Sequence, residues 1–176
     1  MFRITKIVLF ALMFCAEFCS FHTSYSAEVD KLNKEIIGKF QKWTALTATP
    51  DGNKVCYAVI YSSNRIGNYE KSDTKPYFMV HYFGIYKERI SVFFDYNTIS
   101  GSNVFLSIDG KQFVIHPNGN YAISPDSETD VAIIAALQSG KKLLIRAEGE
   151  GGKYTVDEYQ ISGFSKTYQT LKSKCN

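Results

Sequence analysis

Short runs of β-branched and aromatic residues, each ended by turn-forming residues, follow one another through most of the chain after residue 39. Such runs are typical of β-strands, and a chain built from many of them has to bury strand faces in a shared core. The hydrophobic alternation within the runs is imperfect, as expected where both faces of a strand are partly covered. The predicted strands cover Phe40–Thr47, Val55–Ser62, Tyr77–Phe83, Arg89–Asp95, Asn103–Asp109, Gln112–His116, Lys141–Glu148 and Lys153–Ser162.

The turns between these runs are tight, which places successive strands side by side in opposite directions. Asp109-Gly110 is a strong two-residue hairpin signal, and the segments 49–53 and 117–120 combine Pro, Asn and Gly in a comparable way. About eight strands joined by such turns favour an antiparallel β-sandwich of immunoglobulin-like type, with a small β-barrel as the alternative.

One helix is expected within the strand pattern. Ser127 is a suitable N-cap with Asp130 three residues later, Val131 to Leu137 form an apolar body, and Gly140 follows the end of the segment. The sequence therefore predicts an inserted helix between the strand that ends near residue 116 and the strand that begins near residue 141.

Two further segments, 28–39 and the C-terminal tail, also have helical patterns. The tail from Ser165 to Lys174 places Tyr168 and Leu171 at helical spacing, which predicts a C-terminal helix that docks on the sheet. At the other end, the polar segment 28–39 with spaced apolar residues fits a short N-terminal helix or a loose arm.

The first residues have the pattern of a secretory signal peptide. Arg3 and Lys6 give a positive start, Ile7–Phe14 is an apolar run, and Ser26 and Ala27 offer small residues for cleavage. The apolar run is about half of the roughly 20 residues that a membrane-spanning helix needs. We therefore predict export, cleavage after Ser26 or after Ala27, and no stable membrane span after cleavage.

The composition fits one domain and argues against a nucleic-acid partner. Twenty Lys and Arg against seventeen Asp and Glu give a net charge of +3, far from the dense basic patch of a dedicated nucleic-acid binder. A hydrophobic fraction of 45% in 176 residues suffices for one packed core. We expect a signal peptide over 1–26, an arm or short helix over 27–39, and a β-sandwich domain over 40–176.

Cys56 and Cys175 are the cysteines that remain after cleavage. In an oxidising compartment, an even pair of cysteines favours a disulfide. A bridge that closes about 120 residues contributes at most roughly 4–5 kcal/mol in the chain-entropy model. The alternatives are free thiols, or pairing between two copies of the chain through the C-terminal cysteine.

The sequence offers little support for catalysis or metal binding. Neither His81 nor His116 has a second ligand at metal-binding spacing. Asp157 and Glu158 are adjacent on a predicted strand, so their side chains point to opposite faces and cannot act there as an acid–base pair. We expect no catalytic residues, no metal site and no cofactor. The alternative is an envelope enzyme or enzyme accessory whose site joins Asp157, His116 or tyrosines only in the folded chain.

Aromatic residues are concentrated in the segment 77–96, next to a polar segment at 63–75 that is expected to be a loop. Strand alternation turns about half of these rings outward, and tyrosine suits recognition because it loses little side-chain entropy on binding. Core packing is the preferred explanation for the rings, and a recognition face is the alternative. The polar segment is a second candidate for binding, because loops commonly carry specificity. The residues assigned to a binding surface are Arg65, Tyr69, Tyr82, Tyr86 and Tyr96.

Several short motifs occur in a defined order along the exported chain. They are Trp43, Cys56, Lys75-Pro76-Tyr77, Ser100-Gly101-Ser102-x-Val104, Ile108-Asp109-Gly110, an Ala-rich helix before Gly140, Asp157-x-Tyr159-x-x-x-Gly163-Phe164, and Cys175. This ordered set resembles the invasion-associated locus B family of secreted bacterial proteins. The resemblance implies an extracytoplasmic β-sandwich of a Gram-negative bacterium, linked with entry into or interaction with host cells, without an established enzymatic activity or cofactor.

From these features we expect a secreted, non-enzymatic protein of the cell envelope or surface that acts through protein binding. Its partner would be an envelope or host-surface protein. Its location would be the periplasm, the outer-membrane surface or the medium.

Overall fold

The computed structural model describes residues 34–49, 52–69, 72–83 and 88–175. The predicted signal peptide, with Ser26 and Ala27, and the candidate binding residue Tyr86 lie outside these ranges. Residues 33–176 form one compact unit.

Eleven strands, two α-helices and one short 3-10 helix make up the described part of the chain, which confirms the predicted mainly-β fold with one inserted and one C-terminal helix. The elements are β1 (Glu35–Phe40), β2 (Trp43–Ala48), β3 (Val55–Tyr61), β4 (Asn64–Gly67), β5 (Tyr77–Tyr82), β6 (Glu88–Phe93), β7 (Val104–Ile108), β8 (Lys111–Asn118), β9 (Tyr121–Ile123), α1 (Ser127–Ser139), β10 (Lys142–Gly149), η3 (Glu150–Gly152), β11 (Lys153–Gln160) and α2 (Phe164–Lys174).

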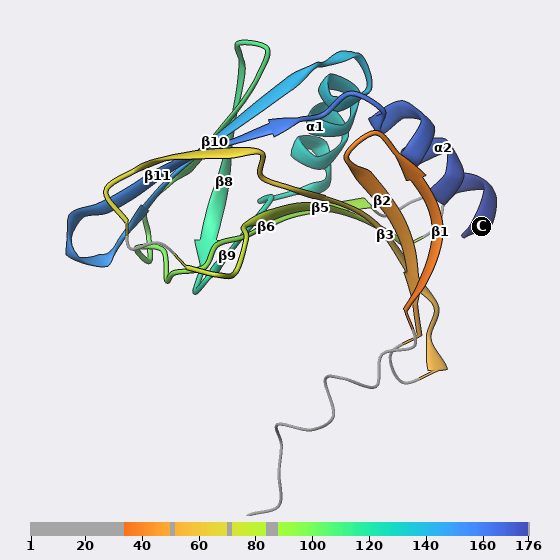
Figure 1. Ribbon diagram of the computed structural model, residues 1–176, viewed down its shortest axis with the longest axis horizontal. Helices are drawn as coiled ribbons and strands as arrows, with labels where there is room; N and C mark the ends of the chain where they lie inside the picture. Colours follow the sequence, from red (N-terminus) through yellow and green to blue (C-terminus); the bar gives the residue numbers. More distant parts are fainter. Residues whose placement is uncertain (1–33, 50–51, 70–71, 84–87, 176) are drawn as a thin grey trace, which may run out of the picture. The chain divides into compact units, whose positions relative to one another are not determined.

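The strands pair antiparallel in one continuous order, β1-β2-β3-β5-β6-β9-β8-β7-β10-β11-β4. This sheet folds over at β8, whose first residues pair with β7 and whose last residues pair with β9. The result is a two-layered, sandwich-like arrangement (Figure 1). We call β1, β2, β3, β5, β6 and β9 the first layer, and β7, β10, β11 and β4 the second layer.

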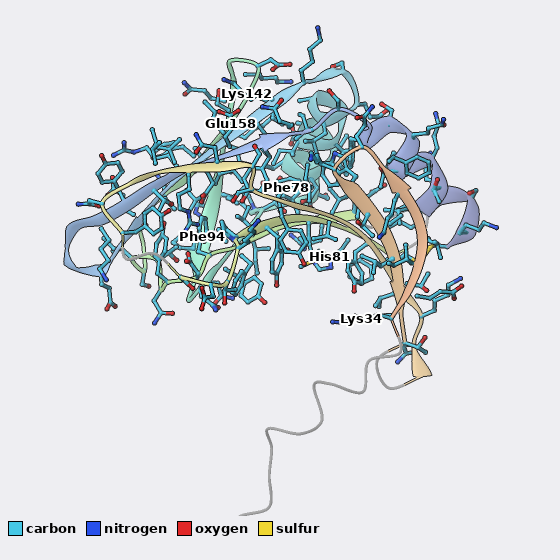
Figure 2. All side chains as sticks on the ribbon, in the orientation of Figure 1. Lys34, Phe78, His81, Phe94, Lys142 and Glu158 are labelled. Carbon is cyan, nitrogen blue, oxygen red and sulfur yellow. A yellow bond between two sulfur atoms is a disulfide. The ribbon has the colours of Figure 1, made fainter. Side chains whose placement is uncertain are left out.

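The core lies between the layers and follows strand alternation. In β5, Phe78, Val80 and Tyr82 are buried, whereas Tyr77, Met79 and His81 on the opposite face are half-buried. Figure 2 shows Phe78 between the layers and His81 on the other side of the same strand. Because side chains alternate with period two, the inward set defines the outward set.

Helix α1 begins with a cap from Asp126 and not from Ser127, which is the first helical residue. Oδ1 of Asp126 accepts a hydrogen bond from the backbone N–H of Thr129 at 2.7 Å, the contact that an N-cap makes. Asp130 does not reach back toward the cap: it is buried and accepts a hydrogen bond from the backbone N–H of Ile90 at 2.8 Å. The capping prediction was wrong because Asp130 attaches the helix to β6.

Helix α2 packs on β1, β2 and β3 and is joined to the first layer by a disulfide between Cys56 and Cys175, 119 residues apart. The predicted pairing of these cysteines is thus confirmed. Trp43 stabilises the same region. The centroids of its ring and the Phe164 ring are 4.9 Å apart, and its Nε1–H donates a hydrogen bond to the carbonyl oxygen of Ile161 at 2.9 Å. Both contacts connect β2 with the segment that follows β11.

Two expectations about polar segments were wrong. Residues 35–39, expected in an arm or short helix, belong to β1, because backbone pairing with β2 outweighs the helical spacing of their apolar side chains. Within the expected loop 63–75, the residues Asn64–Gly67 form β4, which pairs with β11. A search for hydrophobic runs does not detect β4, because it is an edge strand with mostly polar side chains.

The predicted hairpin at Asp109-Gly110 is confirmed. Both residues have positive φ, 46° and 95°, as a two-residue turn with the twist of its strands requires. The Asp109 carboxylate also accepts hydrogen bonds from the backbone N–H groups of Lys141 and Lys142, at 2.8 and 3.1 Å. The turn between β7 and β8 is therefore tied to the start of β10.

Candidate binding surface and buried charge cluster

A row of aromatic side chains crosses the outer side of the first layer. Tyr61, Tyr77, Phe93 and Tyr121 are cross-strand partners on β3, β5, β6 and β9. The centroids of neighbouring rings are 5.8, 4.7 and 5.2 Å apart, and the central pair, Tyr77 and Phe93, is stacked. The register of four adjacent strands thus builds a continuous aromatic row from residues 60 positions apart in the sequence.

Three further rings extend this row along β3 and β5. His81 lies between Tyr57 and Phe83, with centroid distances of 6.4 and 6.1 Å. Tyr61 is 55% exposed and Phe83 is 53% exposed, whereas the rings between them are half-buried. We define the aromatic face as these seven side chains: Tyr57, Tyr61, Tyr77, His81, Phe83, Phe93 and Tyr121.

Burial favours the neutral forms of Tyr77 and His81 on the aromatic face. The hydroxyl oxygens of Tyr77 and Tyr121 are 3.2 Å apart, and burial together with this hydrogen bond raises the pKa of Tyr77. Burial lowers the pKa of His81, whose Nε2 is 2.9 Å from the hydroxyl oxygen of Ser91. The face therefore presents ring edges, phenol hydroxyls and a neutral imidazole.

The five residues assigned to a binding surface from the sequence have different positions. Tyr82 is 1% exposed, so its assignment was wrong: it shares the inward face of β5 with Phe78. Arg65, Tyr69 and Tyr96 come together, with the Arg65 guanidinium 4.7 and 5.7 Å from the two ring centroids. Tyr86 lies outside the described residues.

Sequence reasoning missed Tyr57, Tyr61 and Tyr121 as members of an outward surface. Tyr121 begins a three-residue strand after the turn Gly119-Asn120, and a strand of this length is too short for a clear pattern. An available signal was the alternation of β5, which turns Tyr77 outward when Phe78 is assigned to the core.

Arg65 is the centre of a buried charge cluster that also contains Asp95 and Asp157. Its Nε and Nη2 donate to the two carboxylate oxygens of Asp157, the second bond at 2.8 Å, and its Nη1 donates to Asp95 Oδ1. The exposed fractions of the three side chains are 6%, 4% and 0% in the order Arg65, Asp95, Asp157. Since Asp95 follows β6 whereas Arg65 and Asp157 lie on β4 and β11, the cluster links the two layers.

The cluster carries two carboxylates and one guanidinium. Burial raises the pKa of Asp157, and the hydrogen bonds from Arg65 offset only part of this effect. Burial alone would lower the pKa of Arg65, but its hydrogen bonds to Asp157 and Asp95 outweigh burial and raise it. With all three groups ionised, the cluster has a net charge of −1. Arg65 forms two hydrogen bonds with the Asp157 carboxylate and one with that of Asp95, and the two-bond contact is the stronger kind.

Two tyrosines surround this cluster. The hydroxyl of Tyr96 is 2.7 Å from that of Thr155, and burial raises the pKa of Tyr96 to about 12. Tyr159 is fully buried on β11, and burial raises the pKa of its phenol as well. Both phenols therefore stay neutral and add no charge to the cluster.

A polar pocket with a volume of about 290 Å³ opens next to the aromatic face. It borders both the aromatic row, through Phe93, and the charge cluster, through Asp95 and Tyr96. Its lining consists of Thr74, Phe93, Asp95, Tyr96, Asn97 and Asn120.

The residues of the enzyme alternative do not form an acid–base pair with one another in the contacts of the structure. Both carboxylate oxygens of Asp157 are bound by Arg65, and its side chain is fully buried. His116 is an exposed residue of β8. Glu158 points to the opposite face from Asp157, as predicted from strand alternation; it is half-buried, and its carboxylate accepts a hydrogen bond from Gln160.

The described residues contain no group of three or more His, Cys, Asp or Glu side chains that could hold a metal ion. No helix among them is long and apolar enough to cross a membrane.

Comparison with known proteins relates the chain to one solved fold. No protein-family model matches the sequence, and no curated protein matches it. The crystal structure of invasion associated protein B from Bartonella henselae superposes with a TM-score of 0.55 and 16% sequence identity, covering 77% of this chain and 94% of that one. The two proteins share a fold, which supports the resemblance to the invasion-associated locus B family at the level of architecture.

Proposed function

We propose that the protein is an extracytoplasmic, non-catalytic binding protein that contacts a protein partner through its aromatic face and serves in host-cell invasion or interaction. The observation that carries this proposal is the continuous row Tyr61, Tyr77, Phe93 and Tyr121 on the outer side of the first layer. Contiguous exposed apolar surface on a soluble protein commonly marks an interaction site.

The chemistry of the face favours a protein partner. Tyrosine is enriched at protein interfaces, because a ring with few rotatable bonds supplies contact area while its hydroxyl group forms hydrogen bonds. The rings of Tyr77 and Phe93 are already stacked on each other, so little side-chain entropy is lost when a partner covers them.

Two further observations support the location and biological context. The disulfide between Cys56 and Cys175 is of the kind that persists in oxidising compartments outside the cytoplasm. The shared fold with a protein named for its association with invasion supports a role in contact with host cells.

A binding assay on cultured animal cells tests the proposal. We expect saturable binding of the purified, labelled chain, lost after mild protease treatment of the cell surface. The double variant Tyr61→Ser with Tyr121→Ser should bind at least about tenfold more weakly, the effect of removing interface hot spots. Phe105→Ser is the matched control, since Phe105 is 44% exposed on β7 of the second layer.

Two results would contradict the proposal: binding that survives protease treatment, or an equal loss of binding in Phe105→Ser and in the tyrosine variant. Protease accessibility of the protein on intact bacteria then separates its possible locations. Digestion without lysis supports direct contact with the host, and protection until the outer membrane is opened supports a periplasmic partner.

A further inference from the structure

The polar pocket beside the aromatic face has the charge and hydrogen-bonding groups to receive a cation. Asp95 contributes a carboxylate, Asn97 and Asn120 contribute amides, and Thr74 contributes a hydroxyl group. None of the six described side chains that line the pocket is basic.

The negative charge of this pocket comes from the buried charge cluster. Arg65 binds both oxygens of Asp157 but only one oxygen of Asp95. Asp95, the member of the cluster that lines the pocket, therefore keeps one carboxylate oxygen that Arg65 does not bind. Because its side chain is 4% exposed, water screens this charge poorly.

The pocket is also continuous with the proposed protein-binding surface. Phe93 belongs both to the aromatic row and to the pocket lining, and Asn120 directly precedes Tyr121. A long side chain from a partner that lies on the aromatic face would meet the pocket at the edge of the contact area. The pocket volume of about 290 Å³ is sufficient for one side chain, and it is at the lower end of small-molecule sites.

We propose that this pocket binds a basic side chain, lysine or arginine, of the protein partner. The inference rests on the proposed function for the identity of the partner, whereas the cation preference of the pocket follows from its own charge and lining. Asp95 provides the charge, and the amide oxygens of Asn97 and Asn120 with the hydroxyl of Thr74 accept hydrogen bonds from the ammonium or guanidinium group.

A titration with small probes tests the pocket without the partner. We would follow the nuclear magnetic resonance signals of the Asn97 and Asn120 side-chain amides while adding n-butylammonium or methylguanidinium. The neutral n-butanol and the anionic butyrate, each with the same number of carbon atoms as butylammonium, are the reference probes. Saturable shifts are expected with the two cations and not with the reference probes.

Two variants assign the effect to this pocket. Asp95→Asn keeps an oxygen acceptor for Arg65 but removes the charge, and should weaken cation binding roughly tenfold. Thr74→Lys leaves the charge cluster intact and supplies a competing ammonium group at the pocket, so it should abolish the shifts even where Asp95→Asn does not fold. Ser139→Lys, at the end of α1, adds the same charge elsewhere and should leave them unchanged.

Equal shifts with butanol and butylammonium, or an equal loss in Ser139→Lys and Thr74→Lys, would overturn the inference. The outcome is independent of the cell-binding assay. If the pocket binds no cation while the tyrosine variant loses cell binding, the pocket assignment fails and the proposed function stands. If the pocket binds cations while the tyrosine variant binds cells normally, the proposed function fails and the cation site stands.

Discussion

The first layer of the fold is joined to the C-terminal segment by covalent and apolar contacts in one region, and to the second layer by buried charges in another. Around α2, the disulfide between Cys56 and Cys175 and the contacts of Trp43 hold the first layer to the C-terminal segment. Around β4, Arg65 joins Asp157 of the second layer to Asp95, which follows the first layer. The region around α2 lies far from that around β4 in the fold (Figure 1).

This difference bears on what each region contributes. Apolar burial and a long-range disulfide stabilise a fold with little geometric demand. In a buried ion cluster, the free-energy cost of desolvating the charges offsets much of their mutual attraction. Such a cluster is therefore often no more stabilising than apolar side chains of the same volume. Beside the polar pocket, the ion pair with Arg65 fixes the position of Asp95.

Removal of Asp157 is expected to have the largest effect on stability. Asp157→Ala leaves the Arg65 guanidinium buried with one carboxylate in place of two, and should lower the free energy of unfolding by about 3–5 kcal/mol. Urea denaturation measures this change. Glu158→Ala, at the half-buried neighbour on the opposite face of the same strand, should change stability by less than about 1 kcal/mol. Similar midpoints for both variants would show that the cluster does not hold the layers together.

Loss of the disulfide should have the next largest effect. Replacing Cys56 and Cys175 together with alanine should lower the free energy of unfolding by about 2–4 kcal/mol, because the unfolded chain gains freedom over a long loop. Reduction of the wild-type protein should give a similar decrease. An unchanged denaturation midpoint after complete reduction would mean that packing of α2 alone fixes this region.

A smaller loss is expected from Trp43→Phe. The substitution removes the Nε1–H that donates to the Ile161 carbonyl and should lower stability by about 1–3 kcal/mol. Tyr159→Phe is the matched comparison, because the buried hydroxyl of Tyr159 has no hydrogen-bond partner among the described residues. That variant should be within about 0.5 kcal/mol of wild type. Equal losses in the two variants would argue against a specific role for the Trp43 hydrogen bond.

The smallest expected effect is a pH dependence from His81. Burial lowers its pKa in the folded state, so the unfolded chain binds more protons as the pH falls below about 6.5. The contribution of His81 to stability is complete above that pH and is lost as the pH falls toward the folded-state pKa. Urea unfolding at pH 7 and pH 5 should show a smaller decrease in His81→Gln than in wild type. An identical decrease would place the pH dependence elsewhere.

The sequence predicts local features of this fold well. β-branched and aromatic runs locate most strands, Asp109-Gly110 identifies a hairpin, and the remaining cysteines identify the disulfide. The strands and the hairpin depend on residues that are neighbours in the sequence. The disulfide was predictable because two cysteines can form only one intramolecular pair. The polar β4 was not predicted, because its strand conformation depends on pairing with β11, about 90 residues away in the sequence.

The candidate site depends even more on non-local order. Tyr61, Tyr77, Phe93 and Tyr121 become neighbours only because β3, β5, β6 and β9 are adjacent in the sheet. Arg65 was predicted to belong to a binding surface because its segment is polar. In the structure its side chain is buried and pairs with Asp95 and Asp157, which are distant in the sequence. Sequence alternation could separate inward from outward rings within a strand, but it could not show which strands share a surface.

Site-specific photo-crosslinking tests directly whether the aromatic face contacts a protein partner. A photoreactive phenylalanine analogue would replace Tyr61 on the aromatic face or, as the matched control, Phe105 on the second layer, in bacteria in contact with animal cells. We expect a discrete, protease-sensitive adduct from position 61 and none from position 105. An adduct from position 105 alone, or none from position 61 while the protein still binds cells, would contradict the assignment of the aromatic face.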